Sequence, residues 1–295
     1  MNVEALAAHP RLVAQRLLAL AETVAPFTPA VWPNSDLSPP GQAGALSRQL
    51  LAYLLSLGLL EADGDPQEAY RVPSPAARTA LRSLSFLAAD GAWSPALLAG
   101  VAGLRPRAAW GVPDLIRLEQ LRLEVAAASG RSARPLRARE SALLIIKKRG
   151  PAGDRYLLMR RNHWPGYSFV GGKFEAGIDK TLTDTARREA GEEMNLDRVD
   201  FSVEALPLEP VSLAAISQRK GMLTRYTFHF FQLFASRLEV DGSTFRWFGE
   251  DEIRPEAILT VEAFGHLAYP EIQRALWHDL PGGLGALPSS DLTQK

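Results

Sequence analysis

Cysteine is absent from the 295 residues of this chain. Its absence excludes disulfide bonds and thiolate metal sites, and it is consistent with a reducing compartment. A net charge is also lacking, because Lys plus Arg and Asp plus Glu each number 33, so no overall field attracts the chain to nucleic acid or to an acidic membrane. No uninterrupted apolar run approaches the roughly 18 residues of a membrane span, and charged residues interrupt the N-terminal segment, unlike a signal peptide. We therefore expect a soluble cytoplasmic protein without a membrane partner.

Lysine is missing from the first half of the chain. Residues 1–139 hold 14 Arg and 11 Asp or Glu, a net charge of +3. Because phosphate neutralisation dominates affinity for nucleic acid, so small a positive charge predicts weak binding to duplex DNA. We favour a protein interface, including a homodimer, for this half. DNA binding and a role as a substrate lid are the alternatives.

Helical periodicity dominates the same half. Apolar residues recur with helical spacing in 3–25, whereas the proline-rich residues 26–41 predict a loop. Two short strands, 59–62 and 69–72, flank an Asp-Gly-Asp-Pro turn and predict a hairpin. Further helices are expected at residues 43–58, 74–89, from 94, and 114–128. This element order resembles a winged-helix module, so we expect a mostly α-helical, winged-helix-like domain at residues 1–128 and a linker at 129–137.

The second half contains the pattern with the clearest chemistry. Thr181 and Asp184 predict a capping box, so a helix should begin there and run to about residue 195. On this helix Glu189, Glu192 and Glu193 occupy positions i, i+3 and i+4 and share one face. Such carboxylates repel each other, and a hard cation such as Mg²⁺ removes the repulsion by binding their oxygens together with substrate phosphates. The alternative is a solvated, charged helix face, but the flanking glycines and strands favour the metal site.

These residues resemble the signature of the Nudix hydrolases, which combines a GG-containing loop with a helix of pattern R-E-x-x-E-E. The loop here is Gly171-Gly172-Lys173-Phe174-Glu175-Ala176-Gly177, and Arg188 begins the helical pattern. Flanking segments extend the resemblance: 142–147 (ALLIIK), 156–161 (YLLMRR), 164–169 (WPGYSF), 245–248 (FRWF) and Asp251-Glu252-Ile253. The resemblance implies an α/β class fold, a Nudix α/β/α sandwich with a mixed sheet, over residues 138–281. The Gly-, Ser- and Pro-rich residues 282–295 are expected to form a disordered tail.

Three features depart from the family pattern. The family has a Glu eight positions before the Arg, where this chain has Lys180 in a loop that is two residues longer, and Asp179 is the candidate to stand in for that Glu. Val170 replaces a proline before the glycines. Asn195 replaces a glycine near the end of the Nudix signature, which we call the Nudix box; Asn tolerates the left-handed conformation required there. We expect metal binding to be retained, with changes in loop geometry and substrate fit.

The resemblance also implies roles for individual residues. Glu189, Glu192, Glu193 and the backbone carbonyl of Gly171 are the expected ligands of Mg²⁺ or Mn²⁺. Arg188 is expected to lie against the carboxylates and hold them in place. The implied reaction is the attack of water on a diphosphate, in which the ion lowers the pKa of a bound water and stabilises the leaving phosphate. The general base stays open between Glu189, Glu193 and the late-loop acids Glu250, Asp251 and Glu252.

Residues around the box are candidates for substrate contacts. Trp164, Tyr167 and Phe169 precede the glycines, where substrates of the family pass, although an aromatic side chain beside a strand more often belongs to the core. Glu250 and Glu252 are further candidates. His229 alternates with aromatic residues on a predicted strand, a pattern that favours a sheet position over a catalytic one.

Two classes of function follow from the resemblance. The first is an enzyme acting on a small nucleotide. Pro210 lies fifteen residues past Asn195, a spacing similar to that of the ADP-ribose pyrophosphatases, so an ADP-ribose-like nucleoside diphosphate derivative is our first choice and a noncanonical nucleoside triphosphate the second. The other class is a transcription regulator, with a winged-helix domain that binds DNA and a Nudix half that senses a nucleotide. The intact acids of the box favour the enzyme.

Overall fold

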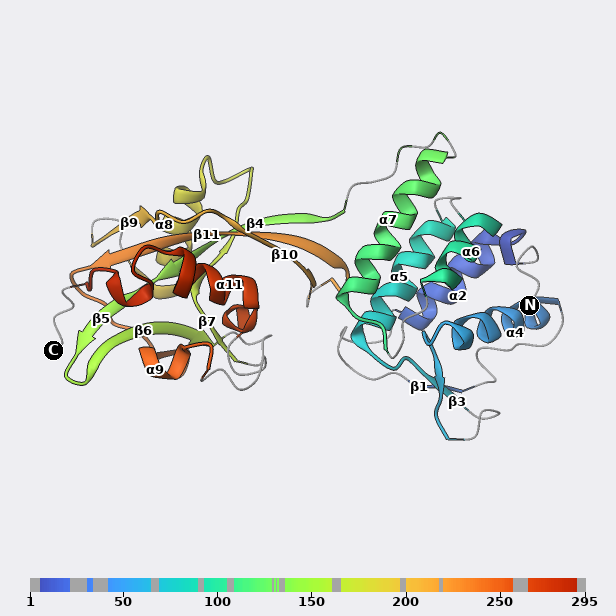
Figure 1. Cartoon of the computed structure of the whole chain (residues 1–295), viewed down its shortest axis with the longest axis horizontal. Coiled ribbons are helices and arrows are strands. Elements are labelled where there is room, and N and C mark those ends of the chain that lie inside the picture. The colour runs from blue at the N-terminus through green and yellow to red at the C-terminus, as the bar shows by residue number, and fades with distance from the viewer. Residues whose placement is uncertain are drawn as a thin grey trace. The chain divides into compact units, whose positions relative to one another are not determined.

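The computed structural model separates the chain into two compact units. Unit 1 comprises Met1–Arg137 and Ala214–Thr224, and unit 2 comprises Ala138–Leu213 and Arg225–Lys295. The fold is mixed α/β with a helical N-terminal region (Figure 1). The structure describes residues 6–21, 31–33, 42–64, 69–89, 93–104, 109–128, 130, 132, 136–160, 166–196, 200–217, 220–256 and 265–290. None of the helices in these residues is long and apolar enough to cross a membrane.

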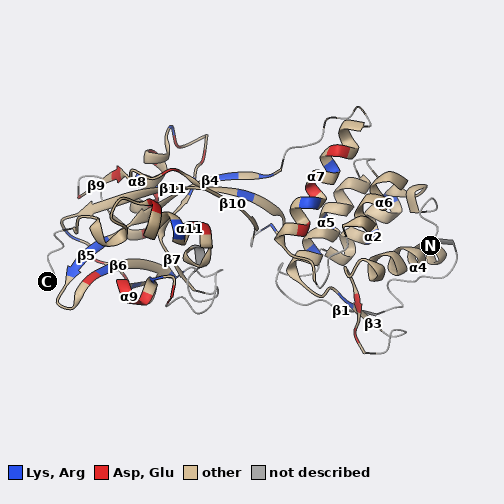
Figure 2. Ribbon diagram, viewed as in Figure 1, with Lys and Arg blue, Asp and Glu red and all other residues tan. Residues whose placement is uncertain are grey.

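The described residues of unit 1 lie mostly in the helices α2 (Pro10–Ala21), α4 (Gln42–Ser56), α5 (Pro75–Ala89), α6 (Pro95–Gly103) and α7 (Val112–Ala128). Their buried faces share one core, which confirms the helices expected from the apolar spacing. Serine caps begin two of them, because Ser74 Oγ accepts from Ala77 N and Ser94 Oγ accepts from Leu97 N. Figure 2 shows that charged side chains are sparse on α2, α4 and α6, whereas α7 carries acids and bases in alternation.

A three-stranded sheet of order β1-β3-β2 accompanies these helices. The expected hairpin is confirmed by the antiparallel pairing of β2 (Glu61–Ala62) with β3 (Ala69–Arg71), while residues 65–68 of its turn lie outside the described residues. The loop expected at residues 26–41 is wrong at β1 (Val31–Pro33), which pairs antiparallel with β3. Three residues are too few for a recognisable alternation, so the strand is specified by its partner.

Unit 1 also includes a segment from far along the chain, Ala214–Thr224. Leu223 is 4% exposed and belongs to the helical core, and Ala214 and Ile216 pack against that core. Thr79 Oγ1 donates to Gly221 O at 3.2 Å, and Arg82 donates to Lys220 O. The boundary expected from the sequence assigned this segment to the second domain, so the two divisions differ here.

Two sheets form the frame of unit 2. The larger sheet has the order β10-β11-β4-β8, with β9 also paired to β11, and the smaller has the order β12-β6-β5, with β7 paired to β6. The larger sheet is mixed, because β11 runs parallel to β4 while β8 and β9 are antiparallel to their partners. The strands are β4 (Ala138–Ile145), β5 (Lys147–Gly150), β6 (Gly153–Arg160), β7 (Tyr167–Ser168), β8 (Val170–Lys173), β9 (Phe201–Ala205), β10 (Val211–Ile216), β11 (Leu223–Ala235) and β12 (Phe245–Gly249). Residues 214–216 of β10 and 223–224 of β11 belong to the segment assigned to unit 1.

The helix α8 (Leu182–Met194) covers one face of these strands. Alternate residues of β4, Ala142 and Leu144, pack in one core cluster with Ala186 and Ala190 of α8. The helices α9 (Glu250–Ile253) and α11 (Pro270–Arg274), with the short helices η1 (Gly265–Ala268), η2 (Ala275–Asp279) and η3 (Leu284–Ala286), follow β12 in the chain (Figure 1). The alternation along β4 holds α8 directly over the glycine-bearing strand β8.

The C-terminal segment differs from the disorder expected for residues 282–295. Leu284 is 1% exposed, and the buried Lys147 Nζ donates to the carbonyls of Gly285 and Leu287, each at 2.7 Å. Ser290 N donates to Lys147 O at 2.9 Å. Residues 282–290 are therefore part of the folded unit, and residues 291–295 lie outside the described residues.

Candidate active site

The helix α8 begins and ends as its sequence predicts. Thr181 Oγ1 accepts from Asp184 N at 3.1 Å, and Asp184 Oδ2 accepts from Thr181 N at 2.9 Å, which confirms the capping box. Asn195 closes the helix with φ of 53°, the left-handed conformation expected of it. These two signals set the start and end of the helix and so decide which side chains of the box share a turn.

The two glycines before α8 allow close approach of backbone and side chain. A Cβ on Gly171, whose φ is +142°, would lie 2.1 Å from Ala142 O. A Cβ on Gly172 would lie 2.1 Å from Glu189 Oε1 and 2.3 Å from Oε2. Only glycine fits either position. The carboxylate of Glu189 consequently lies directly against the backbone of β8.

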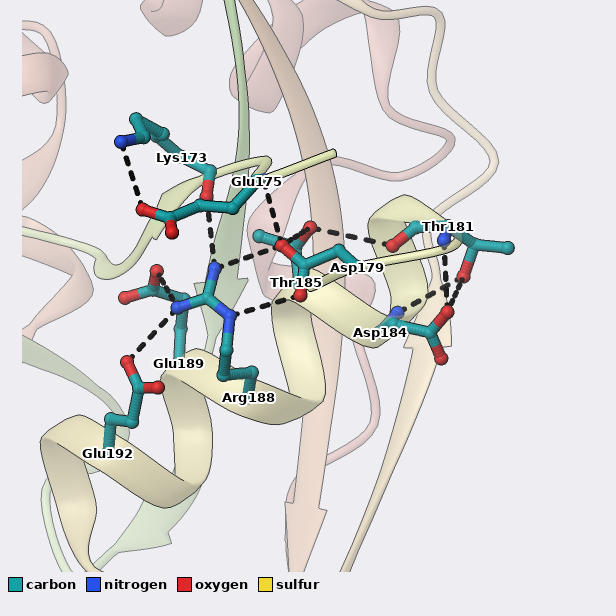
Figure 3. A network of polar contacts seen from close by, with 9 residues as sticks. All are labelled: Lys173, Glu175, Asp179, Thr181, Asp184, Thr185, Arg188, Glu189 and Glu192. Atoms are coloured by element: carbon teal, nitrogen blue, oxygen red, sulfur yellow. Dashed lines mark hydrogen bonds and ion pairs between the residues drawn. The ribbon is translucent and has the colours of Figure 1, made fainter. Parts of the chain in front are cut away.

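The guanidinium group of Arg188 is the centre of the polar network (Figure 3). Its Nε and Nη2 donate to the two carboxylate oxygens of Asp179, each at 3.0 Å, and Nη2 also donates to Lys173 O at 3.0 Å. Its Nη1 donates to Glu189 Oε1 at 2.8 Å and to Glu192 Oε2 at 3.0 Å. These five hydrogen bonds match the five N–H donors of an arginine. Arg188 therefore joins the loop after β8 to the acidic face of α8.

Asp179 is the buried partner of this arginine. Its carboxylate also accepts from Glu175 N at 2.9 Å and from Thr185 Oγ1 at 3.0 Å. The hydrogen bonds from Arg188, with those of the amide and the hydroxyl, lower the pKa of Asp179 to about 2, against the opposing effect of burial. The bond to Asp179 in turn raises the pKa of Arg188. The position that we proposed as a stand-in for the family's Glu is thus a charged anchor for Arg188.

The acids of α8 differ in exposure. Glu189 is buried, Glu193 is half-buried, and the Glu192 side chain is 60% exposed. Glu189 Oε1 and Glu192 Oε2 bind the same Nη1 at 2.8 and 3.0 Å, so these oxygens are within about 6 Å of each other. Carboxylate and carbonyl oxygens are the donors that Mg²⁺ prefers, so the residues fit this ion by their chemistry. In the described part of the chain, however, no group of three acids or histidines converges to hold an ion. The metal ligands stay a prediction, which requires the side chains to rotate around Arg188.

The predicted substrate contacts have different surroundings. Tyr167 is half-buried and packs edge-to-face on Phe248, with ring centroids 4.9 Å apart. Phe169 is fully buried, so its ring fills the core and cannot stack on a base in this conformation. Trp164 lies outside the described residues. Of the two predicted aromatic contacts that the structure describes, Tyr167 keeps part of its surface exposed and Phe169 does not.

The late-loop acids make contacts of their own. Glu250 pairs with Arg254 at 2.7 Å. Glu252 pairs with Arg246 at 3.1 Å and accepts from Gly249 N at 2.8 Å. Asp251 lies beside Gly249, where a Cβ would be 2.4 Å from its Oδ1. These contacts stabilise the turn from β12 into α9 and leave the choice of general base open.

His229 occupies a sheet position on β11, in register with Ala142. Burial lowers its pKa, opposed by the charge of Glu140, so its ring is biased toward the neutral form. Its Nε2 has no hydrogen-bond partner among the described residues. The position agrees with the sheet role that its alternation with aromatics favours.

Comparison with protein families assigns the second half of the chain. The profile of the NUDIX domain matches residues 138–268. These residues form a Nudix domain. The match contains β4, the two glycines, α8 and β12, so the Arg188 network lies within it. A comparison with curated proteins gave no match.

Several solved structures resemble the Nudix domain. NrtR of Shewanella oneidensis is 15% identical with a TM-score of 0.33, over 46% of this chain and 62% of its own. It has also been solved with a 27mer DNA. The C. elegans Ap4A hydrolase is 17% identical with a TM-score of 0.33, over 47% and 93%. The M. smegmatis Nudix hydrolase RenU is 19% identical with a TM-score of 0.30, over 49% and 85%. This chain therefore spans less than two thirds of the length of NrtR.

Proposed function

We propose that the Nudix domain is a Mg²⁺-dependent hydrolase that cleaves the diphosphate linkage of a nucleoside diphosphate derivative. The observation that carries the proposal is the position of Glu189. Its carboxylate lies against Gly172 and binds Arg188, which also binds Glu192 and is anchored by Asp179. A buried carboxylate held beside a second one by a shared arginine is a preorganised acidic site, and a cation with a phosphate substrate would complement it.

Each residue has a distinct part in this proposal. Glu189, Glu192 and Glu193, with the carbonyl of Gly171, would hold the ion. When bound, Mg²⁺ would neutralise charge on the diphosphate and lower the pKa of a bound water. Arg188 orients the carboxylates of Glu189 and Glu192 through its Nη1, and Asp179 fixes Arg188. The general base is one of Glu189, Glu193, Glu250, Asp251 and Glu252, since each is an acid of the box or of the late loop.

The substrate is a small nucleotide in this proposal. An ADP-ribose-like compound is the first choice because of the place of Pro210 in the sequence, and a noncanonical nucleoside triphosphate is the second. Tyr167 is half-buried, so part of its ring surface is available for stacking on a base. Manganese can replace magnesium, since both ions accept oxygen ligands.

A hydrolysis panel tests the proposal. The full chain is assayed with Mg²⁺ or Mn²⁺ on ADP-ribose, NADH, dinucleoside polyphosphates, nucleotide sugars and noncanonical triphosphates. We expect turnover of at least one nucleoside diphosphate derivative, and a loss of about 100-fold or more in kcat/KM for Glu192→Gln and for Glu193→Gln. Glu204→Gln, an exposed acid on β9, is the matched control and should retain activity.

The opposite results have a defined meaning. Wild-type turnover in both box variants at saturating Mg²⁺ would overturn the ligand assignment. Turnover of no substrate, together with salt-sensitive binding of duplex DNA, would replace the enzyme by the nucleotide-sensing regulator.

A further inference from the structure

The helix α7 of unit 1 has apolar residues on two faces. Leu115 and Leu118 are buried in the helical core, each 1% exposed. Ile116 and Leu123 point away from that core and are 37% and 45% exposed. They lie seven residues apart, which is close to two helical turns, so they share one stripe. One apolar face is enough to pack α7 on the core of unit 1. The helix therefore has a second, exposed apolar face.

Polar residues frame this stripe in a regular way. Gln120 is exposed and lies between Ile116 and Leu123 along the stripe. Arg117 and Glu124, also seven residues apart, each follow one of the two aliphatic residues and so line one side of the stripe. Arg117 Nη1 is 3.8 Å from Asp114 Oδ1, which is a long contact. Glu124 forms no ion pair within the part of the chain that the structure describes. This side of the stripe therefore has a positive charge, Arg117, at one end and a negative charge, Glu124, at the other.

We propose that this stripe is the contact face of an antiparallel, two-fold homodimer of α7 helices. A two-fold axis midway between Ile116 and Leu123 places Ile116 of one copy opposite Leu123 of the other. The rise of about 1.5 Å per residue then puts Arg117 about 3 Å along the axis from Glu124 of the second copy, within reach of both side chains. The contact forms twice because the interface is isologous. Gln120 meets its own counterpart near the axis, and an amide can both donate and accept there.

The charges beside the stripe favour an antiparallel α7 helix of a second copy over a parallel one and over nucleic acid. A parallel pair of α7 helices in register would have its two-fold axis along the helices, which puts this edge of the two copies on opposite sides of the interface, so Arg117 and Glu124 could not pair with each other. Nucleic acid would need a basic surface, whereas this edge carries one base and one acid. The net charge of +3 over residues 1–139 is also too small to keep two copies apart. The stripe is therefore complementary to itself.

The size of the interface predicts a weak dimer. A helix of 17 residues is about 26 Å long, so the paired helices bury less area than the roughly 1,200 Å² of a stable complex. We expect reversible association with a dissociation constant on the order of micromolar to tens of micromolar.

Analytical ultracentrifugation of the full chain from about 1 to 200 µM tests the inference, with circular dichroism to show that each variant is folded. We expect Leu123→Glu to raise the dissociation constant about tenfold or more. The control Ile178→Glu changes an aliphatic residue of unit 2 that is 66% exposed and should leave association unchanged. A monomeric wild type at every concentration would overturn the proposal, as would equal association of Leu123→Glu and wild type.

A charge exchange tests the antiparallel geometry. Arg117→Glu and Glu124→Arg should each weaken the dimer about fivefold, because each places like charges together at two symmetric contacts. The double variant restores opposite signs and should recover wild-type association. Failure of the double variant to recover would overturn the two-fold pairing. This result is independent of hydrolysis, so it is separate from the proposed activity of the Nudix domain.

Discussion

Asp179 holds Arg188 through both of its carboxylate oxygens. Oδ1 accepts from Nε and Oδ2 from Nη2, each at 3.0 Å, and the Asp179 side chain is only 2% exposed. Such a bidentate pair fixes the plane of the guanidinium as well as its position. The remaining donors then point to Glu189, Glu192 and the carbonyl of Lys173. Asp179 therefore sets the orientation of Arg188, and through it the positions of both glutamate side chains.

Replacement of this anchor should make stability less sensitive to acid. The pKa of Asp179 is lowered from 3.8 to about 2, so its contribution to the free energy of unfolding is present above about pH 4 and is lost as the pH falls through 2. We expect Asp179→Asn to cost about 1 to 2 kcal/mol at pH 7, a value reduced from the full linkage figure for solvent screening. Urea unfolding of wild type and variant at pH 7, 4, 3 and 2 should show this difference shrinking toward pH 2. A difference that is constant with pH, or as small as that of Glu204→Gln, would contradict it.

The close contact of Gly172 and Glu189 predicts an effect on activity. A Cβ at position 172 would lie 2.1 to 2.3 Å from the Glu189 carboxylate, so Gly172→Ala must displace that carboxylate from β8. We expect a loss of about 100-fold in kcat/KM, because a small misplacement of a positioned group is costly. Gly177→Ala is the matched control, since a Cβ at position 177 meets nothing within 4 Å. Equal activities of the two variants would show that activity does not depend on the position of the Glu189 carboxylate against β8.

The ordered C-terminal segment predicts a difference between two truncations. Removal of residues 281–295 takes away Leu284 and the two carbonyls that accept from the buried Lys147 ammonium. We expect this truncation to lower the free energy of unfolding by about 2 to 4 kcal/mol, from lost burial and unpaired donors. Removal of residues 291–295 alone keeps all these contacts and should change stability little. Thermal melting of the three proteins measures both effects, and identical melting temperatures would show that the tail does not stabilise the fold.

Metal removal should change stability in a site-specific way. If Mg²⁺ binds the folded chain, it stabilises by roughly 1 to 3 kcal/mol at about 10 to 100 times its Kd, which is a shift of a few degrees. Melting curves in Mg²⁺, in chelator and in NaCl of matched ionic strength separate site binding from general screening. Glu189→Ala/Glu193→Ala should lose the magnesium-specific shift. A shift of the same size in NaCl would show that α8 is only a charged surface.

Features formed by residues close together in the chain could be predicted from the sequence, because caps, turns and short spacings specify them. The ends of α8 follow from Thr181, Asp184 and Asn195, which bond or turn within one helix. The hairpin of β2 and β3 follows from two short strands and the turn between them. The Nudix box could also be found from its sequence, because its glycines and acids recur at short, set spacings.

Tertiary structure alone decided the remaining features. The strand β1 and residues 282–290 have the composition of loops, and they are ordered by partners about 40 and 140 residues away, Arg71 and Lys147. The segment 214–224 lies within the predicted Nudix domain by its place in the chain, but Leu223 is buried in the helical core of unit 1. Asp179 could be proposed from its place in the loop, whereas its bidentate bond to Arg188 depends on the path of that loop. Burial and long-range pairing are properties of the folded chain, so composition and local spacing cannot specify them.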